Sequence, residues 1–181
     1  QIDNPSKKMG SWIVQEIIPD KDTLIRSFAN CMYWLVHPGM SPNKRNLGHY
    51  SHIQTQLTRI YKGQLIAWIQ TCPDNVRKVF PSLSCATSLR RANRMQVTNH
   101  IEGDGLLECI GLSWINHVSI SIHDQSGELK YAVHPEKGLV YKWRSSSKIP
   151  SKWNEQKRLI HMLLVSQSPR EQARPVSSMY S

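Results

Sequence analysis

The sequence predicts an α+β fold in which helices pack on one mainly antiparallel sheet. Apolar residues recur at helical spacing in the first part of the chain, most clearly over residues 50–70. Short segments with alternating apolar and polar residues follow, beginning at residues 118–122. Helices first and strands afterwards are the order typical of an α+β domain. A chain of 181 residues is long enough for one such domain with its own core.

The helical segments precede the predicted sheet. Ile53, Leu57 and Ile60 repeat three and four residues apart, which places them on one face of a helix. Asp104 can cap a later helix, because its carboxylate accepts hydrogen bonds from backbone amides that lack partners. The predicted elements are a strand or first helical turn at 12–18, helices at 24–36 and 50–70, a turn at 76–80, a basic helix at 89–95 and a helix at 106–114.

Four segments are predicted to be strands. The segment 118–122 alternates Val, Ser, Ile, Ser and Ile, so one of its faces is apolar and the other polar. The strands are expected at 118–122, 129–133, 139–143 and 159–165, with a polar loop at 143–157. The expected organisation is therefore an N-terminal extension at 1–17, a folded domain at 18–165 and a mobile polar tail at 166–181.

The chain is basic, with a formal net charge of +10. Residues 75–101 contain no acid, and the part from residue 125 onward is rich in Lys and Arg. Such a surface attracts nucleic acid, an anionic membrane surface or an acidic protein. No apolar run approaches the roughly 18 residues of a membrane span, so no transmembrane segment is expected.

The cysteines and histidines do not predict a metal site or a cofactor. Cys31, Cys72, Cys85 and Cys109 are scattered and form no Cys-x-x-Cys pair. A chain of this length does not need disulfides for its stability, so reduced thiols in a cytoplasmic setting are expected. His49 and His52 lie three apart on one predicted helix and could bind a metal, but they have no acidic or cysteine partner nearby.

Two motifs far apart in the chain suggest a cysteine hydrolase. Phe28-Ala29-Asn30-Cys31-Met32-Tyr33 is expected where a loop turns into a helix, and His161-Met162-Leu163-Leu164 lies on a late strand. Between them, Leu65-Ile66-Ala67-Trp68-Ile69 ends a long helix, and Glu102-Gly103-Asp104-Gly105 opens an apolar helix and a strand. In this order and spacing, residues 18–165 resemble the ovarian-tumour (OTU) family of papain-like cysteine proteases, most of which remove ubiquitin.

The resemblance implies a mechanism and a partner. Cys31 would be the nucleophile that attacks an isopeptide carbonyl, with His161 as general base and then general acid. Backbone amides beside Cys31, together with Asn30, would hold the oxyanion. Asn154, or Glu155 beside it, would orient the imidazole. The implied partner is ubiquitin or a ubiquitin-like protein.

The motifs depart from the family pattern, and two alternative alignments remain open. Phe28, Met162 and Leu163 stand where the family has an Asp, an aromatic residue and an Asp or Asn. In the first alternative, Asp20-Lys21-Asp22-Thr23-Leu24-Ile25-Arg26 matches the opening motif, and Thr23 replaces the nucleophile. In the second, residues 159–164 match the preceding strand, and the family histidine falls at 174–178, where this chain has none. Both alternatives imply an inactive protease.

Three functions therefore follow as hypotheses. The first is an active deubiquitinase of viral origin, and the second is a catalytically inactive OTU-like module of a viral structural protein. The third is a basic protein of the matrix type that binds nucleic acid or an anionic membrane. A cytoplasmic protein that also associates with a virion would be consistent with the first two.

Overall fold

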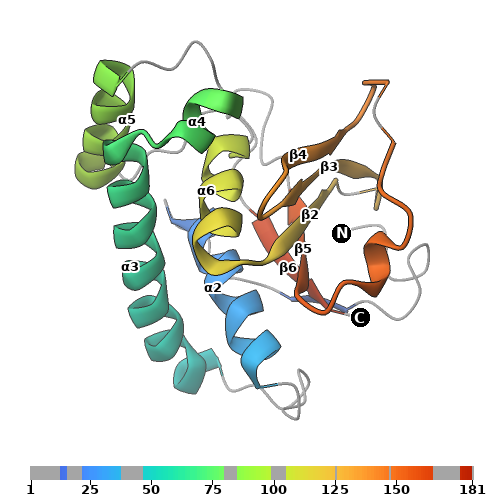
Figure 1. The fold of residues 1–181 in the computed structure, drawn as a ribbon. Helices are drawn as coiled ribbons and strands as arrows, with labels where there is room; N and C mark the ends of the chain where they lie inside the picture. The colour runs from blue at the N-terminus through green and yellow to red at the C-terminus, as the bar shows by residue number, and fades with distance from the viewer. Residues whose placement is uncertain are drawn as a thin grey trace.

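The computed structural model describes residues 13–15, 22–37, 47–79, 85–98, 105–124, 126–146, 148–164 and 176–180. Figure 1 shows the helices gathered on one side of a twisted sheet. The helices are α2 (Thr23–Val36), α3 (Leu47–Thr71), α4 (Asp74–Val79), α5 (Cys85–Thr98) and α6 (Leu106–Asn116), with a short 3-10 helix, η2 (Trp153–Glu155). The strands are β1 (Ile13–Gln15), β2 (Ser119–His123), β3 (Leu129–His134), β4 (Gly138–Lys142), β5 (Leu159–Leu164) and β6 (Val176–Tyr180).

The six strands form one sheet in the order β1-β6-β5-β2-β3-β4. Its parallel pair is β2 with β5, in which Ser121 lies beside His161, and the other pairs among the described strands are antiparallel. The α+β fold and the mainly antiparallel sheet predicted from the sequence are confirmed. The central strands β5 and β2 are covered by α2 and α6.

The main core lies between the sheet and the helices, because apolar side chains of both meet there. Ile120, Ile122, Ile160 and Met162 point from the two central strands to this side. Gly111 allows α6 to approach α3, since a Cβ at this position would lie 2.7 Å from Leu65 Cδ1. The helical members of the core include Leu24, Ile25, Phe28, Cys31, Met32, Leu65, Ile69, Met95, Leu107 and Leu112.

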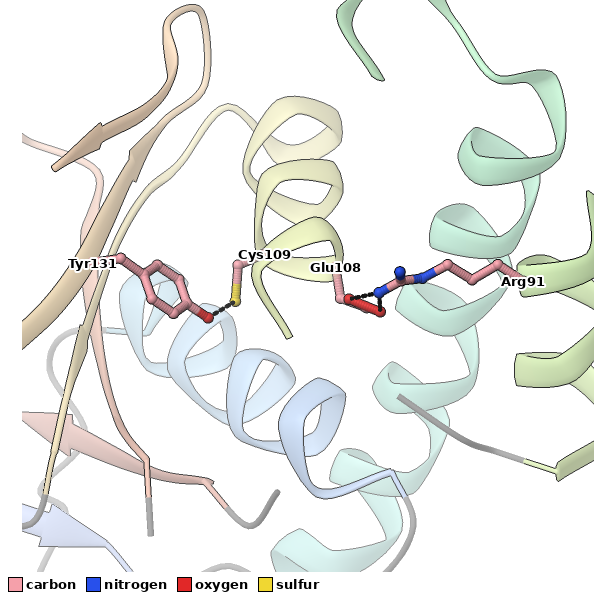
Figure 2. Close-up of polar contacts among 4 residues, drawn as sticks. All are labelled: Arg91, Glu108, Cys109 and Tyr131. Carbon is pink, nitrogen blue, oxygen red and sulfur yellow. Dashed lines mark hydrogen bonds and ion pairs between the residues drawn. The ribbon is translucent and has the colours of Figure 1, made fainter. Parts of the chain in front are cut away.

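Helix α6 connects the sheet to the outer helices through polar contacts on its two sides. Figure 2 shows Tyr131 of β3 donating a hydrogen bond to Cys109 Sγ at 3.5 Å. On the other side, Arg91 Nη2 of α5 lies 2.6 Å from Glu108 Oε1 and 3.1 Å from Oε2. The Glu108 side chain is fully buried, so the guanidinium group compensates a charge that water cannot reach.

The face of the sheet away from the helices is covered by residues 142–158, which we call the basic strap; the structure describes all of it except residue 147. Side-chain hydrogen bonds are among the contacts that hold it on the sheet. Trp153 Nε1 donates to Ser121 Oγ at 2.7 Å, and Ser119 Oγ donates to Gln156 Oε1 at 2.5 Å. In Figure 1 this segment descends past the sheet on the side away from the helices.

Several boundaries differ from the sequence-based expectation. Residues 176–180 were expected in a mobile tail and residues 13–15 in an extension, yet they form β6 and β1 and pair with each other. Strand β1 lies within the segment 12–18, for which a strand was one of the two expectations, whereas β6 lacks the strong apolar alternation that predicts a strand. The turn expected at 76–80 is helix α4. The cap expected at Asp104 lies outside the described residues, and the N-cap position of α6 is Gly105.

Candidate functional site

Cys31 lies in the middle of α2 and not at the start of a helix, so the loop-to-helix junction predicted at Asn30 and Cys31 is wrong. The helix begins at Thr23, because the apolar face that packs on the sheet already includes Leu24 and Ile25. The Cys31 side chain is buried, and its Sγ lies 3.6 Å from the backbone carbonyl oxygen of His161. In this position the thiol receives no stabilisation from a helix N-terminus, which would favour the thiolate.

The His161 side chain points to the other face of the sheet. Its neighbours along β5, Ile160 and Met162, both belong to the core that α2 covers. Because successive side chains of a strand point to opposite faces, the imidazole of His161 faces away from α2. The structure therefore brings Cys31 to the backbone of His161 and separates the thiol from the imidazole.

On that opposite face, His161 is paired with another histidine. The ring centroids of His161 and His123 are 5.8 Å apart. Burial and the neighbouring His123 lower the pKa of His161 to about 3. Burial likewise lowers the pKa of His123 to about 4, although a backbone hydrogen bond of Gly127 and the charge of Asp124 partly oppose it. Both rings are neutral at pH 7, and a base with a pKa near 3 is poorly matched to catalysis at that pH.

The two predicted supporting residues lie apart from each other. Asn30 is buried in α2, where its Oδ1 accepts hydrogen bonds from Trp34 Nε1 at 3.2 Å and Gln54 Nε2 at 2.9 Å. Asn30 thus joins α2 to α3, and its carbonyl oxygen is already occupied. Asn154 is exposed on η2, within the basic strap. The residues of the strap that hydrogen-bond to the sheet include Trp153 and Gln156.

The start of α2 is the position where the first alternative alignment places the nucleophile. Thr23, the first residue of the helix, is 4% exposed. The preceding residue, Asp22, accepts a hydrogen bond from Lys62 of α3 at 2.9 Å. Arg26 donates a hydrogen bond to Oγ1 of Thr55, which also belongs to α3, at 3.2 Å. Polar contacts therefore tie the beginning of α2 to α3, while no cysteine stands at this junction.

The second alternative alignment concerns β6. This strand pairs with β5 through residues 176–179 and also packs against α2. It lies on the side of β5 away from β2, next to the helix whose first residue is Thr23. Its sequence is Val-Ser-Ser-Met-Tyr and contains no histidine.

The polar face of the sheet is covered by a segment that the sequence pattern does not reveal. The alternation of Ser119, Ser121 and His123 with isoleucines announced a polar face, but it could not show what covers that face. A buried tryptophan in a polar loop, Trp153, is the signal that could have indicated the covering segment. The described residues contain no group of three or more side chains suited to hold a metal ion. Within the same part of the chain, no helix is long and apolar enough to cross a membrane.

Comparison with known proteins finds a viral relative. No family model matches the chain. The chain is 34% identical over 146 residues to an uncharacterized protein of Acanthamoeba polyphaga mimivirus. The similar segment covers 80% of this chain and only 9% of that viral protein. The region of similarity is thus a small part of a much longer protein in the virus.

Proposed function

We propose that this chain is a catalytically inactive OTU-like module of a larger viral protein, which binds ubiquitin or a ubiquitin-like protein without cleaving it. The observation that carries the proposal is the first residue of α2, which is Thr23. In the family that the sequence resembles, the nucleophilic cysteine occupies the junction between a loop and this helix. The small share of the mimivirus relative that the similarity covers supports a module within a longer chain.

The start of α2 favours the first alternative alignment over the original one. With Asp20-Lys21-Asp22-Thr23-Leu24-Ile25-Arg26 on the opening motif, the observed start of the helix coincides with the nucleophile position. A threonine hydroxyl needs strong activation by a neighbouring base, whereas a cysteine thiol readily ionises. A threonine at this position therefore argues against the family's acyl transfer.

Strand β6 supports the same conclusion independently. It lies between β5 and β1 and against α2, a position consistent with β5 as the preceding strand of the second alternative alignment. The residues at which that alignment expects the histidine include Val176, Ser177 and Ser178. An OTU-like chain lacking both the cysteine and the histidine would retain the fold and lose the base and the nucleophile together.

The competing hypothesis, a Cys31–His161 pair, has the weaker geometric support. The contact between the two residues is made by the His161 carbonyl oxygen, which cannot act as a general base for a thiol. For activity, the His161 side chain would have to pass through the sheet to the helical side.

The proposal is tested with a ubiquitin probe that carries a C-terminal electrophile. We expect no adduct with the native chain and an adduct with Thr23→Cys, because the new thiol would stand at a helix N-terminus. The double variant Thr23→Cys/Cys31→Ala is the control for reaction at the native Cys31 thiol, and it should react like the single variant. An adduct of the native chain that disappears in both Cys31→Ala and His161→Ala would instead establish an active protease.

Binding is measured separately by titrating isotopically labelled ubiquitin with the native chain and following its NMR signals. Saturable shifts are expected for the native chain and for Cys31→Ala alike, since the thiol has no part in the proposed recognition. Absence of shifts, combined with absence of a Thr23→Cys adduct in a folded protein, would overturn the proposal.

A further inference from the structure

The basic strap, which the proposed function does not use, suggests a second binding surface. We propose that its exposed side chains bind the phosphate backbone of nucleic acid. The strap contains six Lys or Arg residues and a single acid, Glu155. All six basic side chains are exposed: Lys142, Arg144, Lys148, Lys152, Lys157 and Arg158. A polyanion with closely spaced charges is the ligand that gains most from such a surface, because each phosphate neutralised releases condensed counterions.

The strap presents these charges from a fixed backbone. Buried Trp153 and the side chain of Gln156 fasten its second half to the sheet. At its end, Arg158 Nε donates to the carbonyl oxygen of His117, and Arg158 Nη2 to that of Asn116, both at 3.1 Å. A segment already held in place loses little conformational entropy when a ligand binds.

The first half of the strap is held by a cluster of cations around an indole ring. Lys130 Nζ lies 3.6 Å and Arg144 Cζ 4.1 Å from the ring centroid of Trp143. The Trp143 amide donates to the Lys130 carbonyl oxygen at 2.8 Å, and the Ser145 hydroxyl to that of Lys142 at 2.6 Å. Lys130 of β3 also contacts Asp124 at 3.3 Å, so this ion pair compensates its charge and the exposed cations of the surface are those of the strap.

Nucleic acid fits this surface better than a membrane or a protein does. Both of the latter require apolar side chains to insert or to serve as central anchors. In the described part of the strap, Ile149 is the one large apolar side chain that is clearly exposed, at 39%. The ring of Trp143 cannot enter a bilayer without dehydrating the two cations that cover it. Phosphate groups need only the cations and hydrogen-bond donors that are present.

The test compares two triple variants with equal loss of charge. Arg144→Gln/Lys148→Gln/Lys157→Gln removes three strap charges without touching Trp153 or the Arg158 contacts. Its matched control, Arg59→Gln/Lys78→Gln/Arg90→Gln, removes three exposed charges from α3, α4 and α5. Binding is followed by fluorescence anisotropy with labelled single-stranded and duplex oligonucleotides of about 20 nucleotides, at several salt concentrations. Urea unfolding shows whether both variants are as stable as the native chain.

We expect the strap variant to bind at least about tenfold more weakly at about 100 mM salt, with a salt slope smaller by about 2. The control should lose no more than about threefold, since its charges act only through the long-range field. Equal losses in both variants, or no binding by the native chain, would overturn the proposal. Binding to phosphatidylserine vesicles but not to oligonucleotides under the same conditions would assign the surface to a membrane instead. The ratio of single-stranded to duplex affinity identifies the preferred form.

Discussion

The two faces of the sheet are built in different ways. On the helical side, isoleucine and methionine side chains of β2 and β5 pack directly on α2 and α6. On the opposite side, the same strands present Ser119, Ser121, His123 and His161 to a loop that is fixed by hydrogen bonds. One face is stabilised mainly by removal of apolar surface from water, and the other by polar groups whose partners must be correctly placed.

This difference explains why Cys31 and His161, which lie close together on adjacent elements, do not form a catalytic pair. Cys31 belongs to the apolar face and His161 to the polar face, with the strand itself between their side chains. Nearness of backbone positions is therefore insufficient evidence for a dyad. Only the direction of the side chains, which alternates along β5, decides whether a thiol and an imidazole can exchange a proton.

The largest expected loss of stability follows from disrupting the polar face of the sheet. Trp153→Ala removes the buried indole that anchors the strap, and we expect the free energy of unfolding to fall by about 4 kcal/mol. Trp153→Phe keeps much of the packing but removes the hydrogen bond to Ser121, so its cost should be about 1–2 kcal/mol. Urea unfolding measures both values. A loss below about 1 kcal/mol for Trp153→Ala would mean that the strap contributes little to this face.

The next effect concerns the helical side, where one ion pair interrupts the apolar packing. Glu108→Ala should destabilise the protein by about 3 kcal/mol, because Arg91 would lose its buried counter-charge. The double variant Arg91→Met/Glu108→Leu replaces the pair by apolar side chains and should lie within about 1 kcal/mol of the native chain. A thermodynamic cycle with Arg91→Met completes the measurement. Equal destabilisation by the single and double variants would show that packing, rather than charge, dominates this position.

The third effect distinguishes the polar face by its dependence on pH. The pKa values of His123 and His161 are lowered from 6.5 to about 4 and about 3, so the unfolded chain binds more protons than the folded one below pH 6.5. Stability is then highest above pH 6.5 and falls as the pH drops toward 4, by up to about 1.4 kcal/mol per pH unit for each histidine.

Urea unfolding at a series of pH values checks this sign and its origin. His161→Gln should lose less stability on acidification than the native chain, because one of the two groups no longer titrates. His52→Gln, at an exposed position on α3, is the matched control and should follow the native curve. Identical curves for the native chain and His161→Gln would contradict the assignment of the pH dependence to the histidine pair.

The sequence predicted most of the architecture because its signals were local. Helix α3 and strand β2 have clear periods of 3.6 and 2, and both lie where the pattern places them. Helix α2 starts within one residue of the helix expected at 24–36, and only the loop end that the motif around Cys31 implied at Asn30 is wrong, because the apolar face begins at Leu24. Strand β1 lies within the segment 12–18, for which a strand was one of the two expectations, whereas β6 was not predicted because its sequence has no strong alternation and only its pairing with β5 and β1 defines it.

The candidate site was harder to predict than the fold. That Cys31 and His161 lie on neighbouring elements agrees with the sequence-based expectation of proximity. The face of the sheet on which each side chain lies depends on which strand packs against α2, and this is a property of the tertiary packing. The role of Asn30 in linking α2 to α3 likewise depends on Gln54, which no motif connects to it. Local pattern therefore indicates which residues are polar and buried, but not the partners they find.

The pairing of β1 with β6 also determines how the protein would respond to a pulling force. Ile13 lies opposite Tyr180, so the outer end of β1 and the outer end of β6 leave the sheet at the same place. Tension applied at these two residues acts along the inter-strand hydrogen bonds, which run perpendicular to antiparallel strands. The bonds would break one after another, as in a zipper, and β1 should peel away before the central strands carry any load. A module built in this way is mechanically weak at its edge and can open there while its core stays folded.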